Sequence, residues 1–145
     1  MTDTQSLYEK DYALWLDRTI ADLKAKRLEA IDWQNLIEEV EGLAGRDRRE
    51  LLSRLTTLLE HLLKRKYINL PECYRGWEVT IRRTRIEIER LLSFSPSLSR
   101  YFISAVDDCY CKATLIVNTE YGVVCPEECP FPSDPDRLLN DTFWE

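Results

Sequence analysis

The stretch DWQNLIEEVEGLAGRDRRELLSRLTTLLEHLLKRKY, residues 32–67, decides the fold. Its apolar residues recur at helical spacing, and Asp32 is a good N-cap because a carboxylate accepts a hydrogen bond from a free backbone N–H of the first turn. Seven leucines fall within residues 51–63, which predicts a broad, buried helix face. A continuous helix would be about 52 Å long, whereas a compact chain of this size is roughly 38 Å across. We therefore expect a break or kink at Gly42–Gly45; the alternative is a helix that protrudes and meets a partner.

Helical periodicity also precedes and follows this stretch. A helix that ends near residue 27 precedes it, and because only a short turn at 28–31 joins the two, we expect them to lie antiparallel. Two more helices follow, one from Trp77 and one over residues 97–121. The last segment, 122–145, holds four of the six prolines and is predicted to form an ordered tail with one short helix.

The fold class that follows is all-α, a four- to five-helix bundle with an ordered proline-rich C-terminal tail. We expect residues 1–145 to form one domain, in which 1–121 make the bundle and 122–145 the tail that packs on it. A chain of this length buries roughly 68–70% of its unfolded surface, so it needs no metal or disulfide to fold. The tail is predicted to be anchored by Phe131, Leu138, Leu139, Phe143 and Trp144.

Charge is distributed unevenly along the chain. The net charge is −6, from 20 basic and 26 acidic side chains. Residues 1–45 sum to −5, residues 46–90 to +5 and residues 91–145 to −6. A basic middle between acidic ends indicates that neighbouring helices pair their charges; the alternative is a surface for an anionic partner such as RNA.

Several classes of protein are excluded by the sequence. No apolar run reaches the ~20 residues that a membrane helix needs, and the first residues lack the secretory pattern, so we expect a cytoplasmic protein without membrane contact. The five cysteines are an odd number without an export signal, which favours free thiols. Phosphate-binding glycine loops and the G-x-S-x-G and H-E-x-x-H motifs are absent, and we expect no cofactor.

The only histidine, His61, is the first candidate for chemistry. With Arg54 it forms R-x6-H, a spacing that places both on one helix face two turns apart. This spacing resembles the arginine–histidine signature of the HEPN ribonucleases, small helical bundles in which the histidine serves as acid or base and the arginine stabilises phosphate charge. The alternative is a half-buried, hydrogen-bonded histidine beside the leucine stripe.

A metal site at His61 is a third interpretation. Glu38 and Glu39 do not reach it, because along one helix they lie over ~30 Å away, and after a fold-back at the glycines the offset is still ~15 Å. The cysteines do not supply a zinc set either, because the pair at 109 and 111 points to opposite sides of a helix. We therefore expect no metal. A site at His61 would have to draw acids from other helices: Asp11, Asp17, Asp107 or Asp108.

An ordered set of short motifs covers nearly the whole chain. The motifs are D-x3-W (Asp11, Trp15), D-W-x-N-L-I-E-E-V-E-x-L (32–43), L-L-x-H-L-L-K (58–64), W-x3-I-x3-R (77–85), S-P-S-L (95–98) and C-P-F (129–131). In this order they resemble the family called domain of unknown function 29, small bacterial proteins abundant in cyanobacteria. The resemblance implies an all-helical, cytosolic protein without an established activity. Its recurring positions, which read as caps, core tryptophans and interhelix ion pairs, are Asp11, Trp15, Asp32, Glu38, Glu39, His61, Lys64, Trp77 and Arg85.

The function that we expect from the sequence is a non-catalytic helical interaction or regulatory module. Its partner would be a second copy of the chain, as a homodimer, or another protein of a two-component module. The alternative is a metal-independent ribonuclease that uses Arg54 and His61.

Overall fold

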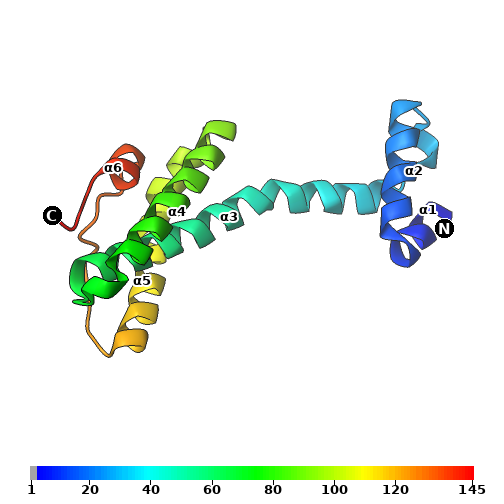
Figure 1. The fold of residues 1–145 in the computed structure, drawn as a ribbon. Coiled ribbons are helices and arrows are strands. Elements are labelled where there is room, and N and C mark those ends of the chain that lie inside the picture. Colours follow the sequence, from blue (N-terminus) through cyan, green and yellow to red (C-terminus); the bar gives the residue numbers. More distant parts are fainter. Residues whose placement is uncertain (1–2) are drawn as a thin grey trace. The chain divides into compact units, whose positions relative to one another are not determined.

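The computed structural model describes residues 3–145, with side chains from Leu7 onward (Figure 1). Regular structure in this part of the chain is helical, which confirms the predicted all-α class. The described residues gather into two compact units, Met1–Arg46 and Asp47–Glu145, here called the N-terminal and C-terminal units. The elements are α1 (Asp3–Lys10), α2 (Tyr12–Lys24), η1 (Leu28–Ala30), α3 (Trp33–Tyr67), η2 (Pro71–Cys73), α4 (Tyr74–Phe94), α5 (Leu98–Tyr121) and α6 (Pro135–Asn140).

A break or kink was predicted at Gly42–Gly45, and the break is wrong, because α3 runs as one α-helix from Trp33 to Tyr67. A kink there stays a prediction. A glycine inside a helix costs about 1 kcal/mol relative to alanine, but it keeps its backbone N–H and the hydrogen bond that proline would remove. A helix of this length does not fit within a single compact globule, whereas the described residues form two compact units. That residues 1–145 act as one domain stays a prediction.

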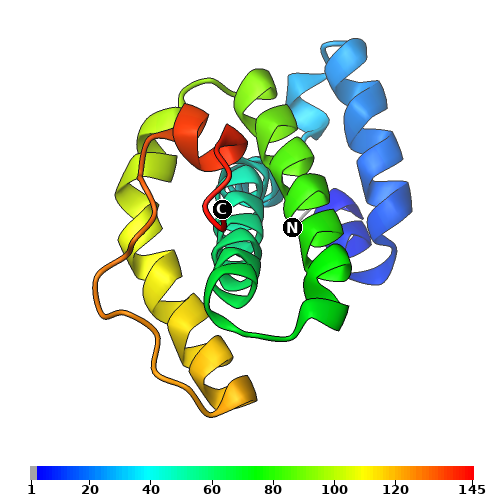
Figure 2. The same ribbon diagram turned by 60° about the vertical axis from the view of Figure 1, so that its left-hand side comes forward.

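The N-terminal unit is built around Trp15, which is fully buried. Helices α1 and α2 pack against each other, and Asp11 separates them by capping α2: its carboxylate accepts a hydrogen bond of 3.0 Å from the Leu14 N–H. Figures 1 and 2 show that α2 crosses the start of α3 instead of lying alongside it, so the predicted antiparallel pair is wrong. Because α2 crosses α3, it leaves apolar side chains of α3 uncovered.

The C-terminal unit is built on the leucine face of α3. Figure 2, which looks nearly along α3, shows α4 and α5 on opposite sides of it. Ion pairs join the layers: Arg54 to Glu87 connects α3 with α4, and Lys64 to Glu120 connects α3 with α5. The predicted buried face is confirmed, since six of its leucines have no exposed surface: Leu51, Leu55, Leu58, Leu59, Leu62 and Leu63.

The C-terminal tail is ordered, as predicted, and it contacts the core of the C-terminal unit. Gly122 ends α5 in the left-handed conformation (φ 62°), which glycine adopts without strain. The chain then returns along α5, where the Tyr110 hydroxyl donates a hydrogen bond of 2.6 Å to the carbonyl of Pro126. The predicted anchors lie in or against the core: Phe131, Leu138 and Leu139 are buried, and Phe143 and Trp144 are partly buried beside them.

Among residues 3–145, the structure contains no helix with the length and apolar character needed to cross a membrane.

Candidate functional site

Arg54 and His61 lie two turns apart on α3, as their spacing predicts, but their side chains have different partners. The Arg54 guanidinium forms ion pairs with Glu87 (2.7 Å) and Glu50 (3.7 Å). His61 Nδ1 lies 2.8 Å from the carbonyl oxygen of Thr57, which can only accept, so Nδ1 carries the proton and Nε2 is the other, acceptor nitrogen. Burial lowers the pKa of His61 below its usual value of 6.5.

This arrangement has only part of what a ribonuclease needs. An uncharged imidazole with an acceptor nitrogen is suited to a general base. The Arg54 guanidinium, in contrast, is already neutralised by two carboxylates, so little of its charge remains to stabilise a phosphate. The ribonuclease alternative stays a prediction, and the pairing of Arg54 does not favour it.

Metal-ligating side chains are not grouped in the part of the chain that the structure describes. It contains no cluster of three or more histidine, cysteine, aspartate or glutamate side chains arranged to hold a metal ion. All five cysteines are free thiols. Burial raises the pKa of the Cys109, Cys125 and Cys129 thiols. Because thiolates are the form that binds metals and attacks electrophiles, these three cysteines are suited to packing.

In the N-terminal unit, the family positions serve mainly as caps and core. Asp32 caps α3 as predicted: its carboxylate accepts hydrogen bonds from the backbone N–H (3.3 Å) and the side-chain amide (2.6 Å) of Asn35. Trp15 fills the centre of the unit, with its ring 4.7 Å from that of Tyr8. Glu38 is exposed, and no ion pair or hydrogen bond of its side chain is found within the described residues.

Glu39 joins α1 and α2 to α3. Its carboxylate accepts hydrogen bonds from the hydroxyls of Tyr8 (2.5 Å) and Tyr12 (2.6 Å). The bonds from Tyr12 and Tyr8 lower the pKa of Glu39, and the bond to Glu39 raises the pKa of Tyr8 to about 12. The carboxylate is thus ionised at neutral pH and held by two aromatic side chains.

In the C-terminal unit, the family positions hold helices and the tail together. Lys64 is largely buried and pairs with Glu120 at 3.1 Å, with its ammonium 5.8 Å from the centre of the Tyr121 ring. Trp77 is buried and packs edge-on against the same Tyr121 ring, 6.2 Å away. These side chains fix α4 and α5 against α3.

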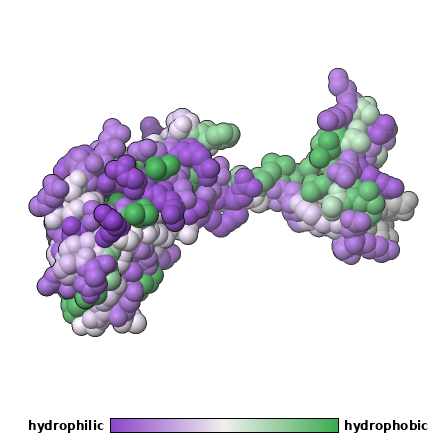
Figure 3. All heavy atoms as spheres, viewed as in Figure 1, coloured by the Kyte–Doolittle hydropathy of each residue, from purple (hydrophilic) through white to green (hydrophobic). Residues whose placement is uncertain are grey.

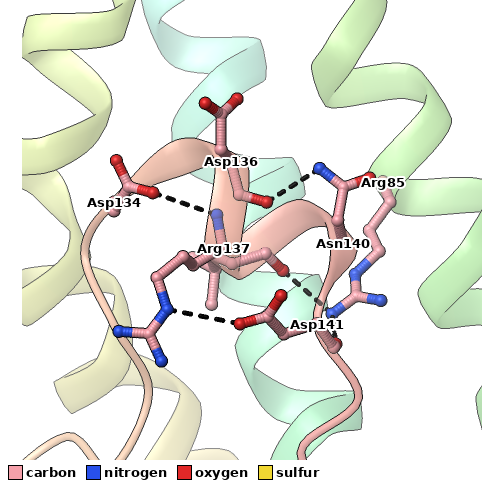
Figure 4. A network of polar contacts seen from close by, with 7 residues as sticks. Arg85, Asp134, Asp136, Arg137, Asn140 and Asp141 are labelled. Atoms are coloured by element: carbon pink, nitrogen blue, oxygen red, sulfur yellow. Dashed lines mark hydrogen bonds and ion pairs between the residues drawn. The ribbon is translucent and has the colours of Figure 1, made fainter.

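Arg85 holds the C-terminal tail (Figure 4). Its Nη2 donates hydrogen bonds to the carbonyl oxygens of Leu138 (2.9 Å) and Asp141 (2.7 Å), which lie in and just after α6. Burial lowers the pKa of Arg85, and its Nε is buried without a hydrogen-bond partner. Beside it, a cavity of about 370 Å³ is lined by charged and polar groups of α4 and the tail, among them Arg82, Arg85, Glu89 and Asn140.

The N-terminal unit carries an exposed apolar surface on α3, here called the α3 face: Trp33, Ile37, Val40 and Leu43. Their exposed fractions run from 47% for Trp33 to 58% for Leu43. The spacing of four, three and three residues places them along one side of the helix. Figure 3 shows apolar residues gathered on the side of this unit that the view presents.

A second exposed surface lies on α4, here called the α4 face. Three apolar side chains lie on it, and Phe94 at the helix end is 87% exposed. Counted at 100° per residue, its members fall within about 120° of the helix circumference. The face consists of Arg75, Val79, Arg82, Arg83, Ile86, Arg90 and Phe94, all of them exposed.

Neither face was anticipated as a surface from the sequence. Helical spacing of apolar residues over 32–67 does not distinguish the buried leucines from the exposed residues between 33 and 43. On α4, a second stripe at helical spacing, Trp77, Ile81, Ile88 and Leu91, is buried. The signal for the α4 face was present, because Val79 and Ile86 are seven residues apart and lie off that stripe.

Comparison with known proteins gives the family. A model of the family described as "Domain of unknown function DUF29" matches residues 7–144. Because the match covers nearly the whole chain, the protein belongs to this family, which confirms the resemblance of its motifs. Comparisons with curated proteins and with solved structures returned no match.

Proposed function

We propose that this member of the DUF29 family is a non-catalytic interaction module that binds a protein partner through the α3 face. The supporting observation is that the N-terminal unit buries few of its large apolar side chains. Among its described side chains, only two large apolar residues are buried, Trp15 and Ile31. Nine are exposed: Tyr12, Leu14, Ile20, Leu23, Leu28, Trp33, Ile37, Val40 and Leu43.

The energetics of apolar burial favour a partner on this surface. Fully burying a leucine, isoleucine or valine stabilises by about 1.5–3 kcal/mol, so covering the exposed half of one contributes about 1 kcal/mol. The four residues of the α3 face together contribute about 4 kcal/mol, close to a thousandfold in affinity. Their helical spacing is typical of an amphipathic helix that lies against an apolar groove.

The roles of the family positions support a module without catalysis. Asp11 and Asp32 are engaged as helix caps, and Lys64 and Arg85 hold neighbouring elements. Side chains used in this way are not available to bind or activate a substrate.

Cross-linking in cells tests the proposal. The tagged chain is treated with a photoactivated cross-linker, and the cross-linked peptides are identified by mass spectrometry. We expect residues 33–43 to be cross-linked to one specific protein, which is either another protein or a second copy of this chain. The double substitution Ile37→Asn, Val40→Asn is expected to abolish this link, because it places polar groups in the middle of the α3 face.

A matched control is available on α5. Leu115 and Ile116 are also exposed apolar helix residues, at 68% and 44%. The variant Leu115→Asn, Ile116→Asn should leave the cross-links unchanged. If the α3 variant and this control show the same cross-links as the wild type, the α3 face is not an interaction surface and the proposal fails.

The ribonuclease alternative is tested separately by incubating the purified protein with total RNA. Because Arg54 is neutralised by Glu87 and Glu50, we expect the wild type and His61→Ala to leave the RNA equally intact. Cleavage by the wild type that is lost in His61→Ala would establish the nuclease and contradict a non-catalytic role.

A further inference from the structure

We propose, building on the function above, that a second copy of this chain is the partner, and that the α3 face of one copy packs against the α4 face of the other. Both faces expose apolar side chains along one side of a helix, and the charges beside them are opposite. The contact is therefore defined by residues of this chain alone.

The α4 face is basic, and its arginines have no partners of their own. None of Arg75, Arg82, Arg83 and Arg90 forms an ion pair with another described residue. The ion pairs that α4 does form involve its glutamates, Glu78 with Arg65 and Glu87 with Arg54. Arg82 and Arg83 are adjacent and repel each other, and acidic side chains placed against them would relieve the repulsion.

The α3 face is bordered by unpaired acids. Glu41 adjoins Ile37 on the helix surface, at a separation of four residues, and Glu38 precedes Glu41 by three. Both are exposed, and neither forms an ion pair with another described residue. Glu39, held by Tyr8 and Tyr12, adds a third carboxylate on the other side of Val40.

The two faces also agree in length. Trp33 to Leu43 spans about 15 Å of helix, and Val79 to Phe94 spans about 22 Å, so the shorter α3 face fits within the longer α4 face. A standard interface buries about 800 Å² on each partner. In a two-fold dimer this contact is made twice, so each contact needs to cover only ~400 Å² on each of its two faces.

The apolar residues of the α4 face favour a protein over RNA as its occupant. A surface that binds a phosphate backbone needs lysine and arginine and gains nothing from valine or isoleucine. Val79 and Ile86 lie among the arginines, where they match the apolar side chains of the α3 face. The acidic border of that face would itself repel a nucleic acid.

A charge-swap experiment tests the contact. Variant A carries Arg82→Glu and Arg83→Glu, and variant B carries Glu38→Lys and Glu41→Lys. Light scattering after size exclusion should give the wild type twice the chain mass of 17.2 kDa. Each variant alone should associate at least ~10-fold more weakly, because variant A reduces the summed charge of the α4 arginine positions from +4 to 0, and variant B changes that of positions 38, 39 and 41 from −3 to +1. An equimolar mixture of A and B should recover the dimer, since the glutamates introduced in A face the lysines introduced in B, and the two unchanged faces keep their opposite charges.

The control carries the same charge change on another helix: Arg100→Glu with Lys112→Glu, two exposed residues of α5. This control should dimerise as the wild type does, and circular dichroism should show equal helix content in all variants. A wild type that stays at 17.2 kDa at every concentration, or variants A and B that dimerise alone as well as when mixed, overturns the inference. So does a monomer that binds a labelled RNA through the arginines of the α4 face.

The two proposals fail in different ways. If the wild type is a monomer but residues 33–43 still cross-link to another protein in cells, only the second-copy inference falls. If Ile37→Asn, Val40→Asn changes neither the cross-links nor the mass, the interaction surface itself falls.

Discussion

Removing the Arg85 guanidinium should release the C-terminal tail at a predictable cost. The substitution Arg85→Met keeps much of the aliphatic stem and deletes two hydrogen bonds, to the carbonyl oxygens of Leu138 and Asp141. Hydrogen bonds from a charged donor contribute about 1.5–3 kcal/mol each, and because Arg85 is half-exposed we use the lower end, about 3 kcal/mol for the pair. The substitution also removes the buried Nε that has no hydrogen-bond partner, which raises the free energy of unfolding of the variant by about 1 kcal/mol.

The expected net loss is therefore about 2 kcal/mol in the free energy of unfolding. For a chain of this size this corresponds to roughly 8 °C in melting temperature. Urea unfolding followed by circular dichroism measures the loss, and hydrogen exchange shows where it arises: the amides of α6 should exchange faster than in the wild type. The amides of Leu138 and Asp141, which bond to carbonyls of Asp134 and Arg137, are the most direct reporters.

Arg100→Met is the control, because Arg100 lies on α5 outside both faces, is exposed and forms no ion pair with another described residue. Its stability should change by no more than about 0.5 kcal/mol. Equal losses for the two variants, or a loss in Arg85→Met without faster exchange in α6, would refute the reasoning that Arg85 holds the tail.

Two further predictions concern titration. The depressed pKa of His61 means that the unfolded chain takes up its proton first, so the free energy of unfolding should decrease as the pH falls through 6.5 toward the pKa in the folded state. His61→Gln should flatten this dependence in urea titrations, and parallel curves would show that burial of His61 does not govern it. Glu39→Gln should shift the pKa of Tyr8 from about 12 back toward 10, visible as tyrosinate absorbance that rises at lower pH; an unchanged titration would contradict the bonds to Glu39.

The local structure of the chain could be predicted well. Leucine spacing predicted the buried face of α3, and it is buried because so many large apolar side chains on one helix side have no favourable alternative. Asp32 and Gly122 predicted helix ends, since capping depends on one residue and the backbone next to it. The tail anchors followed from apolar residues in a segment otherwise rich in proline.

The predictions that failed concern which elements of the chain lie next to each other in the fold. The break expected at Gly42–Gly45 is absent, because the described residues form two compact units and α3 does not have to fit within a single globule. Ile37 and Val40 have the periodicity of a core and are exposed, because α2 crosses α3 and does not cover them.

The candidate surfaces depend on both the local sequence and the tertiary structure. The sequence by itself determined the helices, their buried sides and the alternation of acidic and basic segments, because periodicity, capping and charge act over a few residues along the chain. Only the tertiary structure decided that Arg54 forms an ion pair with Glu87, that Arg85 donates hydrogen bonds to the tail, and that the α3 and α4 faces stay exposed. An amphipathic pattern specifies which side of a helix is apolar, whereas burial of that side depends on elements far away in the sequence.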